Sequence, residues 1–336
     1  MPQPLQHLRQ ANKTLFHRTG LITVVTLAIA SSGCSHRSAG HANSHLNSQM
    51  NSHPNSNTVV LLPDELGESS GLICLADGHF LSHNDSGHSS TLFKFDQRGR
   101  ILQRYPIQAP NTDWEAITRS EQALWIADIG DNQGQRSQIT LHRLPLPLPA
   151  RVDARHAAQP VLPTQSVLTV QSSHWHYPNR PIKLVPYQHD YDAEALVYRH
   201  GELHLISKSW QSNIAKVYHA NDAGELRLLA EIKDLPGLVT DAVYHDASQH
   251  YIMVGYRNLR QQVLSFMFSQ DYQPFIALID KNFQVIRHRS LPFAGQVEGV
   301  CIDQSEQIWL TQEQSQQQPA ALWRYGALTV LQEADE

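Results

Sequence analysis

The sequence has few cysteines, little charge and no run of basic residues. Only 3 of its 336 residues are cysteine, 17% are charged, and the formal net charge is −5. Because no segment is rich in Lys and Arg, the chain lacks the electrostatic footprint of a nucleic-acid-binding protein. We therefore expect no nucleic-acid partner.

Long apolar segments are also missing. The most apolar stretch, residues 21–30, is about half of the roughly 20 residues that span a bilayer. It follows basic residues and precedes Cys34, an order that resembles a bacterial lipoprotein signal with a lipidated cysteine. Ser31 departs from that signal, which usually has a larger aliphatic residue there, so cleavage without lipidation stays open. We predict a signal segment at 1–34 and a protein anchored in the bacterial cell envelope through Cys34, on the outer membrane or facing the periplasm, or secreted if not lipidated.

The rest of the chain divides into a tether and one domain. Residues 35–57 are rich in Ser, His and Asn and have almost no aliphatic side chains, so we expect them to be disordered. From residue 58 onward, short apolar runs alternate with Gly, Asn, Asp and Pro, and no long segment has the helical period. We predict one all-β domain over 58–336, monomeric, with no membrane contact beyond the N-terminal lipid.

One pattern occurs five times in this domain: an acidic or polar residue, a small residue and then aliphatic residues. The five segments are ESSGLICL, DWEAIT, DAEALVY, TDAVYH and VEGVCID. Each precedes a second apolar run, and a spacing of about 45 residues is the length of one propeller blade. The pattern predicts a β-propeller of four-stranded antiparallel blades, five in number. The segments DWEAIT and DAEALVY are separated by a longer stretch, which also holds a proline-rich excursion at about 144–165. A sixth blade within this stretch stays open as the alternative.

Two features concern closure of the ring. The segment TVVLL at 58–62 is predicted to pair into the last blade, which would remove an exposed sheet edge. Cys74 and Cys301 lie at nearly equivalent positions in the first and last inner strands, which closure makes neighbours. A disulfide or two packed thiols would both fit there.

Carboxylates gather where the predicted inner strands begin and their neighbours end, because these ends meet at one mouth of the propeller. Such crowding is costly unless a cation compensates it. With oxygen ligands and scattered histidines, Ca²⁺ or Mg²⁺ is favoured over zinc. The alternative is a hydrated channel lined by charges. The candidate metal ligands are Asp113, Glu115, Asp128, Asp131, Asp192, Glu194, Asp241 and Glu298.

Two functions fit this mouth. The first is a metal-dependent hydrolase of phosphate or carboxylate esters, with Glu115 or Glu194 as the base. Lys208 and Arg257, at the same mouth, would stabilise developing negative charge or hold an anionic ligand. The second is a non-enzymatic envelope propeller that holds a small ligand or a partner protein. Further candidate ligand-binding residues are His83, Asn84, Asp85 and Glu313.

The blade motifs also resemble a known group of proteins. The series SGL, HNDSG, DWEAI, ADIGDN, DAEAL, EGV and TQE, between Glu68 and Tyr325, resembles bacterial secreted or lipid-anchored propellers grouped around the esterase-like domain of phytases. It is less closely similar to calcium-activated nucleotidases, which are five-bladed propellers with acidic residues around a central calcium. The resemblance implies the architecture, and no catalytic residue is carried over from either family.

Overall fold

Short β-strands make up most of the described chain, and helix is almost absent. The computed structural model describes residues 58–149, 167–220, 224–257, 272–293, 295–315 and 318–333. The predicted signal segment, the tether and most of the proline-rich excursion lie outside these residues. Within them the helical elements are η1 (Asp64–Leu66) and α2 (Thr329–Gln332). No helix there combines the length and the apolar character that crossing a membrane requires.

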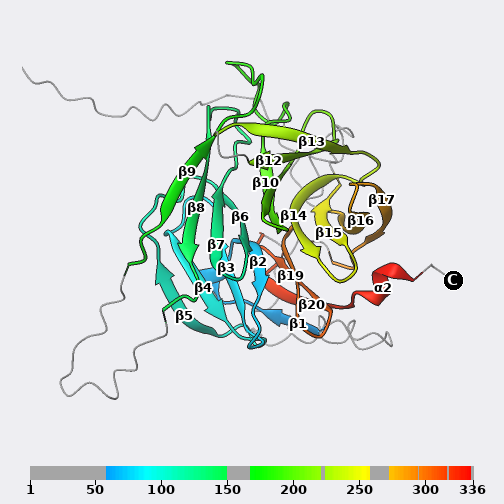
Figure 1. The fold of residues 1–336 in the computed structure, drawn as a ribbon. Helices are drawn as coiled ribbons and strands as arrows, with labels where there is room; N and C mark the ends of the chain where they lie inside the picture. Colours follow the sequence, from blue (N-terminus) through cyan, green and yellow to red (C-terminus); the bar gives the residue numbers. More distant parts are fainter. Residues whose placement is uncertain are drawn as a thin grey trace, which may run out of the picture. The chain divides into compact units, whose positions relative to one another are not determined.

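The strands form five sheets of four antiparallel strands each (Figure 1). Blade 1 contains β2 (Ser69–Cys74), β3 (Phe80–Asn84), β4 (Thr91–Phe95) and β5 (Ile101–Pro106). Blade 2 contains β6 (Trp114–Arg119), β7 (Ala123–Asp128), β8 (Ile139–Pro145) and β9 (Gln171–Trp175). Blade 3 contains β10 (Ala193–Arg199), β11 (Glu202–Ser207), β12 (Ala215–Ala220) and β13 (Leu226–Ile232). Blade 4 contains β14 (Leu238–His245), β15 (His250–Tyr256), β16 (Pro274–Asp280) and β17 (Val285–Ser290). Blade 5 contains β18 (Val297–Ile302), β19 (Gln307–Gln312), β20 (Ala321–Ala327) and β1 (Thr58–Leu61).

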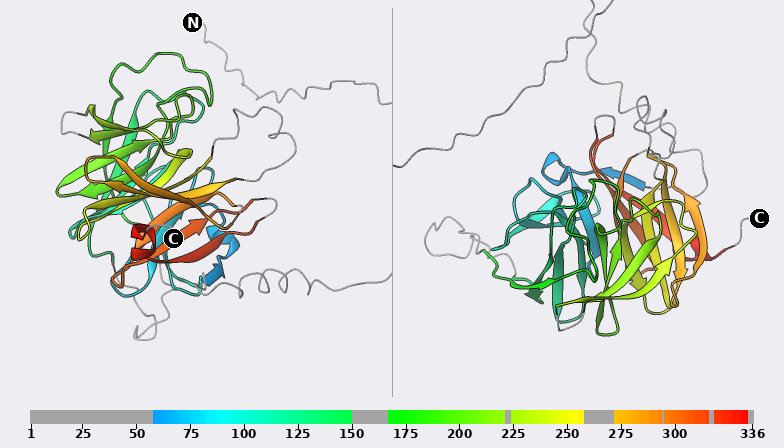
Figure 2. Two further views of the ribbon diagram at one scale, coloured as in Figure 1. Left: turned by 90° about the vertical axis from the view of Figure 1, so that its right-hand side faces the viewer. Right: turned by 90° about the horizontal axis from the view of Figure 1, so that it is seen from above.

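The first strand of each blade lies innermost, and these strands contact one another in a closed cycle. The cycle runs β2, β6, β10, β14, β18 and back to β2. Figure 2 shows the five sheets from two further sides. The fold is thus a five-bladed β-propeller, and the prediction from the sequence repeat is confirmed. The described part of the gap between β6 and β10 holds the rest of blade 2 and the loop before β10, and no sixth sheet.

Two links close the ring between blades 5 and 1. Strand β1 pairs with β20, with Thr58 opposite Arg324, so the predicted role of the TVVLL segment is confirmed. A disulfide joins Cys74 of β2 to Cys301 of β18, with a Cα–Cα distance of 5.5 Å. Of the two arrangements that the sequence left open for these cysteines, the structure has the disulfide.

Apolar side chains fill the spaces between neighbouring blades. Between blades 1 and 2, for example, Leu81 and Leu92 pack with Leu124 and Ile126, all at most 1% exposed. Each blade presents apolar side chains to both neighbours because successive residues of a strand point to opposite faces. Burial of each such side chain contributes about 1.5–3 kcal/mol. This packing fixes the inner strands and therefore the groups at their ends.

A β-bulge recurs near the start of the inner strands. The pairing of each with its neighbour skips one residue in four blades, and the skipped residues are Glu115, Glu194, Thr240 and Glu298. A bulge leaves its extra residue outside the ladder and re-aims the side chain. Three glutamates are thereby released from strand pairing at equivalent places around the ring. We call this end of the propeller, where the inner strands begin, the mouth.

Candidate functional site

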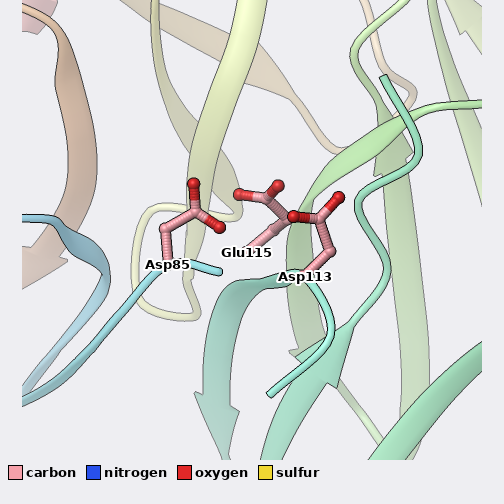
Figure 3. A group of neighbouring side chains, drawn as sticks. All are labelled: Asp85, Asp113 and Glu115. Atoms are coloured by element: carbon pink, nitrogen blue, oxygen red, sulfur yellow. The ribbon is translucent and has the colours of Figure 1, made fainter. Parts of the chain in front are cut away.

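Three carboxylates from blades 1 and 2 meet at the mouth. Asp85 follows β3, Asp113 precedes β6, and Glu115 is the bulge residue of β6. One carboxylate oxygen of each lies within 4.8 Å of the others. Figure 3 shows the three carboxyl groups turned toward a common space. We call these residues the acidic triad.

The local chain explains how the triad is assembled. The backbone N–H of Asp85 donates to the carbonyl of Glu68 at 2.9 Å, which extends the β2–β3 ladder by one residue. The N–H of Ile129 donates to the carbonyl of Asp113 at 3.0 Å and does the same for β6 and β7. Gly130 follows at once, and a Cβ atom there would clash with Asp113 Oδ2 and Glu115 Oε1. The absence of a side chain at Gly130 therefore gives these two carboxylates their space.

Burial acts on all three groups of the triad, and repulsion from neighbouring carboxylates adds to its effect. Burial and then the charge of Asp85 raise the pKa of Asp113 to about 6. The same two causes, followed by the charge of Glu194, raise the pKa of Glu115 well above its usual value. Burial also raises the pKa of Asp85. Nearby Lys208, Arg136 and Ser86 offset these effects only in part, since the pKa stays raised in all three groups, and a cation would favour their charged forms further.

Lys208 is the buried cation of the mouth. Its Nζ donates to Glu194 Oε1 at 2.7 Å, and Lys208 and Glu194 are 5% and 3% exposed. The ammonium also lies over the rings of Trp210 and Tyr256, at 5.1 and 5.2 Å from their centroids. Burial acts to lower the pKa of Lys208, but the charges of Glu194 and its neighbours hold it well above the usual value. Lys208 is therefore charged, and its ammonium is held by Glu194.

Blade 5 contributes a second group of carboxyls. Glu298 is the bulge residue of β18, and Glu313 follows β19. Gln296 donates through Nε2 to Glu313 Oε1 at 2.6 Å. Burial, followed by the charge of Asp85, raises the pKa of Glu313 to about 8, and burial raises the pKa of Glu298 well above its usual value. Among the described residues, Glu298 Oε2 has no hydrogen-bond partner.

Three other carboxylates that were predicted to bind a metal already have ion-pair or hydrogen-bond partners within the protein. Asp128 pairs with Arg136 at 2.6 Å, and Asp131 pairs with Arg180 at 2.8 Å. Asp192 accepts hydrogen bonds from the Asp131 N–H and from a tryptophan indole, each at 2.6 Å. Although burial acts to raise the pKa of Asp128, the adjacent His142 and Arg136 hold it below its usual value. These three carboxylates hold the loops of blades 2 and 3 in place.

The remaining predicted residues lie apart from the triad. Asp241 Oδ2 accepts the N–H of Val300 at 2.8 Å, so this carboxyl links β14 to β18 one residue deeper than the bulge. Arg257 follows β15 and is exposed at the mouth, and it is in no ion pair with a described residue. His83 is fully buried, and burial lowers its pKa to about 4. Asn84 donates to the Glu65 carbonyl at 2.8 Å.

Several groups of the mouth were not predicted from the sequence. Arg136 and Arg180 come from loops outside the repeats, where no pattern marks them. Trp210 and Tyr256 did carry a signal, because each lies within two residues of a predicted mouth cation. Gly130 lies inside the motif ADIGDN, beside the predicted aspartates.

The chain is only distantly similar to proteins of known structure. No protein-family model and no curated protein sequence matches the chain. Among solved structures, a virginiamycin B lyase from Staphylococcus aureus is similar over 80% of this chain and 98% of its own, with 9% identity and a TM-score of 0.42. A gluconolactonase from Xanthomonas campestris is similar over 80% of this chain and 90% of its own, with 12% identity and a TM-score of 0.39. Similarity at this level assigns no activity to this chain.

Proposed function

We propose that this chain is an envelope-located, metal-dependent hydrolase of phosphate or carboxylate esters. The proposal rests on the acidic triad, whose carboxylate oxygens converge within 4.8 Å. The ion pairs of the mouth involve Asp128, Asp131 and Glu194, and none among the described residues involves the triad. The groups best placed to hold a cation are thus the ones that are in no ion pair with a described residue.

The donor set fits Ca²⁺ or Mg²⁺. Both are hard cations that prefer oxygen ligands, and carboxylates at an electrostatic cost in the free protein are relieved when a cation binds. In Asp113, with a pKa of about 6, the charged form prevails at neutral pH. A divalent cation held here would polarise the ester oxygen of a substrate and lower the pKa of a bound water.

The chain's own residues supply the other functions of a hydrolase. Lys208 presents a fixed ammonium that favours negative charge developing on the substrate. Glu194 accepts a hydrogen bond from that ammonium at 2.7 Å, and its charge raises the pKa of Glu115; we assign to Glu194 the role of the base. Arg257, at the exposed end of β15, would contact an anionic substrate at the rim. We propose a small ester with an anionic group as the substrate.

A second function, non-enzymatic binding of a ligand or partner protein, is favoured by one observation. The Lys208–Glu194 pair gives the mouth an internal cation that is buried and complete. This part of the mouth is therefore complete without a metal. Activity on a panel of phosphate and carboxylate esters, with and without a chelator, distinguishes the two functions.

Calcium-dependent stabilisation tests the metal site itself. Wild-type protein should melt at a higher temperature in Ca²⁺, because a ligand at a hundredfold excess over its dissociation constant stabilises the folded state by about 2.7 kcal/mol. Glu115→Gln should lose most of this shift. Glu121→Gln is the matched control, because Glu121 is exposed in the turn between β6 and β7, and it should keep the shift. Superimposable calcium titrations for wild type and Glu115→Gln would exclude Glu115 as a ligand.

The envelope location needs a separate test at Cys34. A lipid precursor should label the wild-type protein and leave Cys34→Ser unlabelled, because the thioether to lipid can form only on the cysteine. Equal labelling of both proteins, or labelling of neither, would exclude lipid anchoring at this residue.

A further inference from the structure

The blade 4 and 5 side of the mouth differs in composition from the acidic triad. Besides Glu298 and Glu313 it carries the rings of Tyr256 and Tyr272, whose centroids are 5.0 Å apart at an interplanar angle of 68°. The charges of Glu313 and Glu298 both raise the pKa of the Tyr272 phenol after burial, so this phenol lies within electrostatic reach of both carboxyls. Two carboxyls and two tyrosine rings thus form one group on this side of the mouth.

One acceptor of this group has no donor. Gln296 donates to Glu313 Oε1 at 2.6 Å, and Lys208 donates to Glu194 on blade 3 at 2.7 Å. Glu298 Oε2 is left without a partner among the described residues, although Glu298 is only 3% exposed. A buried acceptor without a donor costs about 1–3 kcal/mol, which a hydrogen-bond donor on a ligand would recover.

The mouth already shows which kind of donor suits these surroundings. The Lys208 ammonium lies 5.2 Å from the Tyr256 centroid and 5.1 Å from that of Trp210, while it donates to a carboxylate. An ammonium gains from ring faces and from carboxylates together. A metal ion gains from the carboxylates, whereas the ring faces offer it no oxygen ligand.

We propose that the Glu298, Glu313, Tyr256 and Tyr272 group is a subsite for an organic ammonium, such as a primary amine on a ligand of this mouth. The ammonium donates to Glu298 Oε2 and contacts the face of Tyr272. The Lys208 ammonium donates to Glu194, and among the described residues it makes no hydrogen bond to Glu298 Oε2. Binding at this subsite requires neither the metal nor hydrolysis, so it can fail or succeed independently of the proposed function.

The test uses n-butylammonium chloride as the probe, with n-butanol and sodium chloride as matched controls for the alkyl chain and the ionic strength. Binding is followed by the melting temperature and by tryptophan fluorescence, since Trp210 lies at the mouth. Butylammonium should raise the melting temperature of the metal-free protein above both controls. Equal melting temperatures in butylammonium and sodium chloride would overturn the proposal.

Variants then locate the site. Glu298→Gln keeps the shape and should weaken butylammonium binding about tenfold, and Tyr272→Leu should weaken it without changing any charge. Glu115→Gln, in the triad, should bind the amine as wild type does. Unchanged binding in Glu298→Gln and Tyr272→Leu would refute the subsite. Loss of a calcium-induced shift in Glu298→Gln, with no amine shift in wild type, would instead identify a second metal site.

Discussion

Two sets of carboxylates lie within one mouth and differ in what surrounds them. Asp128 and Asp131 pair with arginines at 2.6 and 2.8 Å. Asp113 and Glu115, on the same β6–β7 hairpin, have other carboxylates as neighbours, and burial and repulsion raise the pKa of both. The first set stabilises the loops, whereas burial and repulsion cost the second set free energy that a cation would recover. Residue type and position at the mouth alone therefore do not identify a metal ligand, because the ion-pair partners of each carboxylate decide whether it can bind a cation.

Neutralising one residue of each set should have opposite effects on stability, and this is the largest effect that we expect. Asp128→Asn leaves the Arg136 charge without its partner and should cost about 3 kcal/mol of unfolding free energy. Asp113→Asn removes one of several repelling charges and should leave the protein as stable or slightly more stable in metal-free buffer. Urea denaturation of both variants measures the difference. Equal losses would mean that the two sets are alike.

A side chain placed against the triad should destabilise the protein and displace the carboxylates of the second set. In Gly130→Ala, the new Cβ would displace Asp113 and Glu115, which should cost about 1–3 kcal/mol and abolish the calcium shift. Gly87→Ala is the control, because Gly87 has a positive φ of 83° but nothing within 4 Å of its Cβ position. Gly87→Ala should lose some stability and keep the calcium shift. A full calcium shift in Gly130→Ala would show that this close approach does not matter for binding.

The two sets should also respond to pH with opposite signs, at about 1 kcal/mol per pH unit for each group. Asp113, with a pKa of about 6, holds more protons in the folded than in the unfolded state, and so does Glu313 of blade 5, outside both sets, with a pKa of about 8. Their contribution therefore makes the unfolding free energy fall as the pH rises from about 4 toward 8. Asp128 has a lowered pKa, so its contribution is lost as the pH falls through that pKa.

Denaturation at a series of pH values, with and without Ca²⁺, measures this behaviour. Saturating Ca²⁺ should flatten the part of the decline between about pH 4 and pH 6, and Asp113→Asn should flatten the same part in metal-free buffer. A metal-free stability that keeps rising from pH 5 to pH 8 in the wild type would contradict the raised pKa values.

The fold was predictable from the sequence because it depends on a repeated pattern. Every blade repeats the order of a polar, a small and then aliphatic residues. Blade 5 lacks a fourth strand from its own end of the chain, and the TVVLL segment supplies it. The described residues on either side of the excursion near 144–165 belong to blade 2, since β8 ends at Pro145 and β9 begins at Gln171. Period and composition were sufficient for these features.

The site was less predictable, because it depends on the pairing register of the inner strands and on the ion-pair partners of each carboxylate. In β14 the pairing skips Thr240, so Asp241 lies one residue deeper than Glu115 or Glu194 and binds backbone instead of facing the triad. A shift of one residue is below what a short repeat such as TDAVYH can resolve. Asp128 and Asp131 looked equivalent to Asp113 because their arginine partners lie in loops without a pattern.

The double closure of the ring has a mechanical consequence. A pull on the segment before Thr58 enters the domain through β1, the outermost strand of blade 5, and loads its hydrogen bonds to β20 first. If β1 were torn away, the inner strands β2 and β18 would still be joined by the covalent bond between Cys74 and Cys301. The inner ring that carries the mouth is therefore protected from force at the N-terminal side, with β1 as the part that yields first.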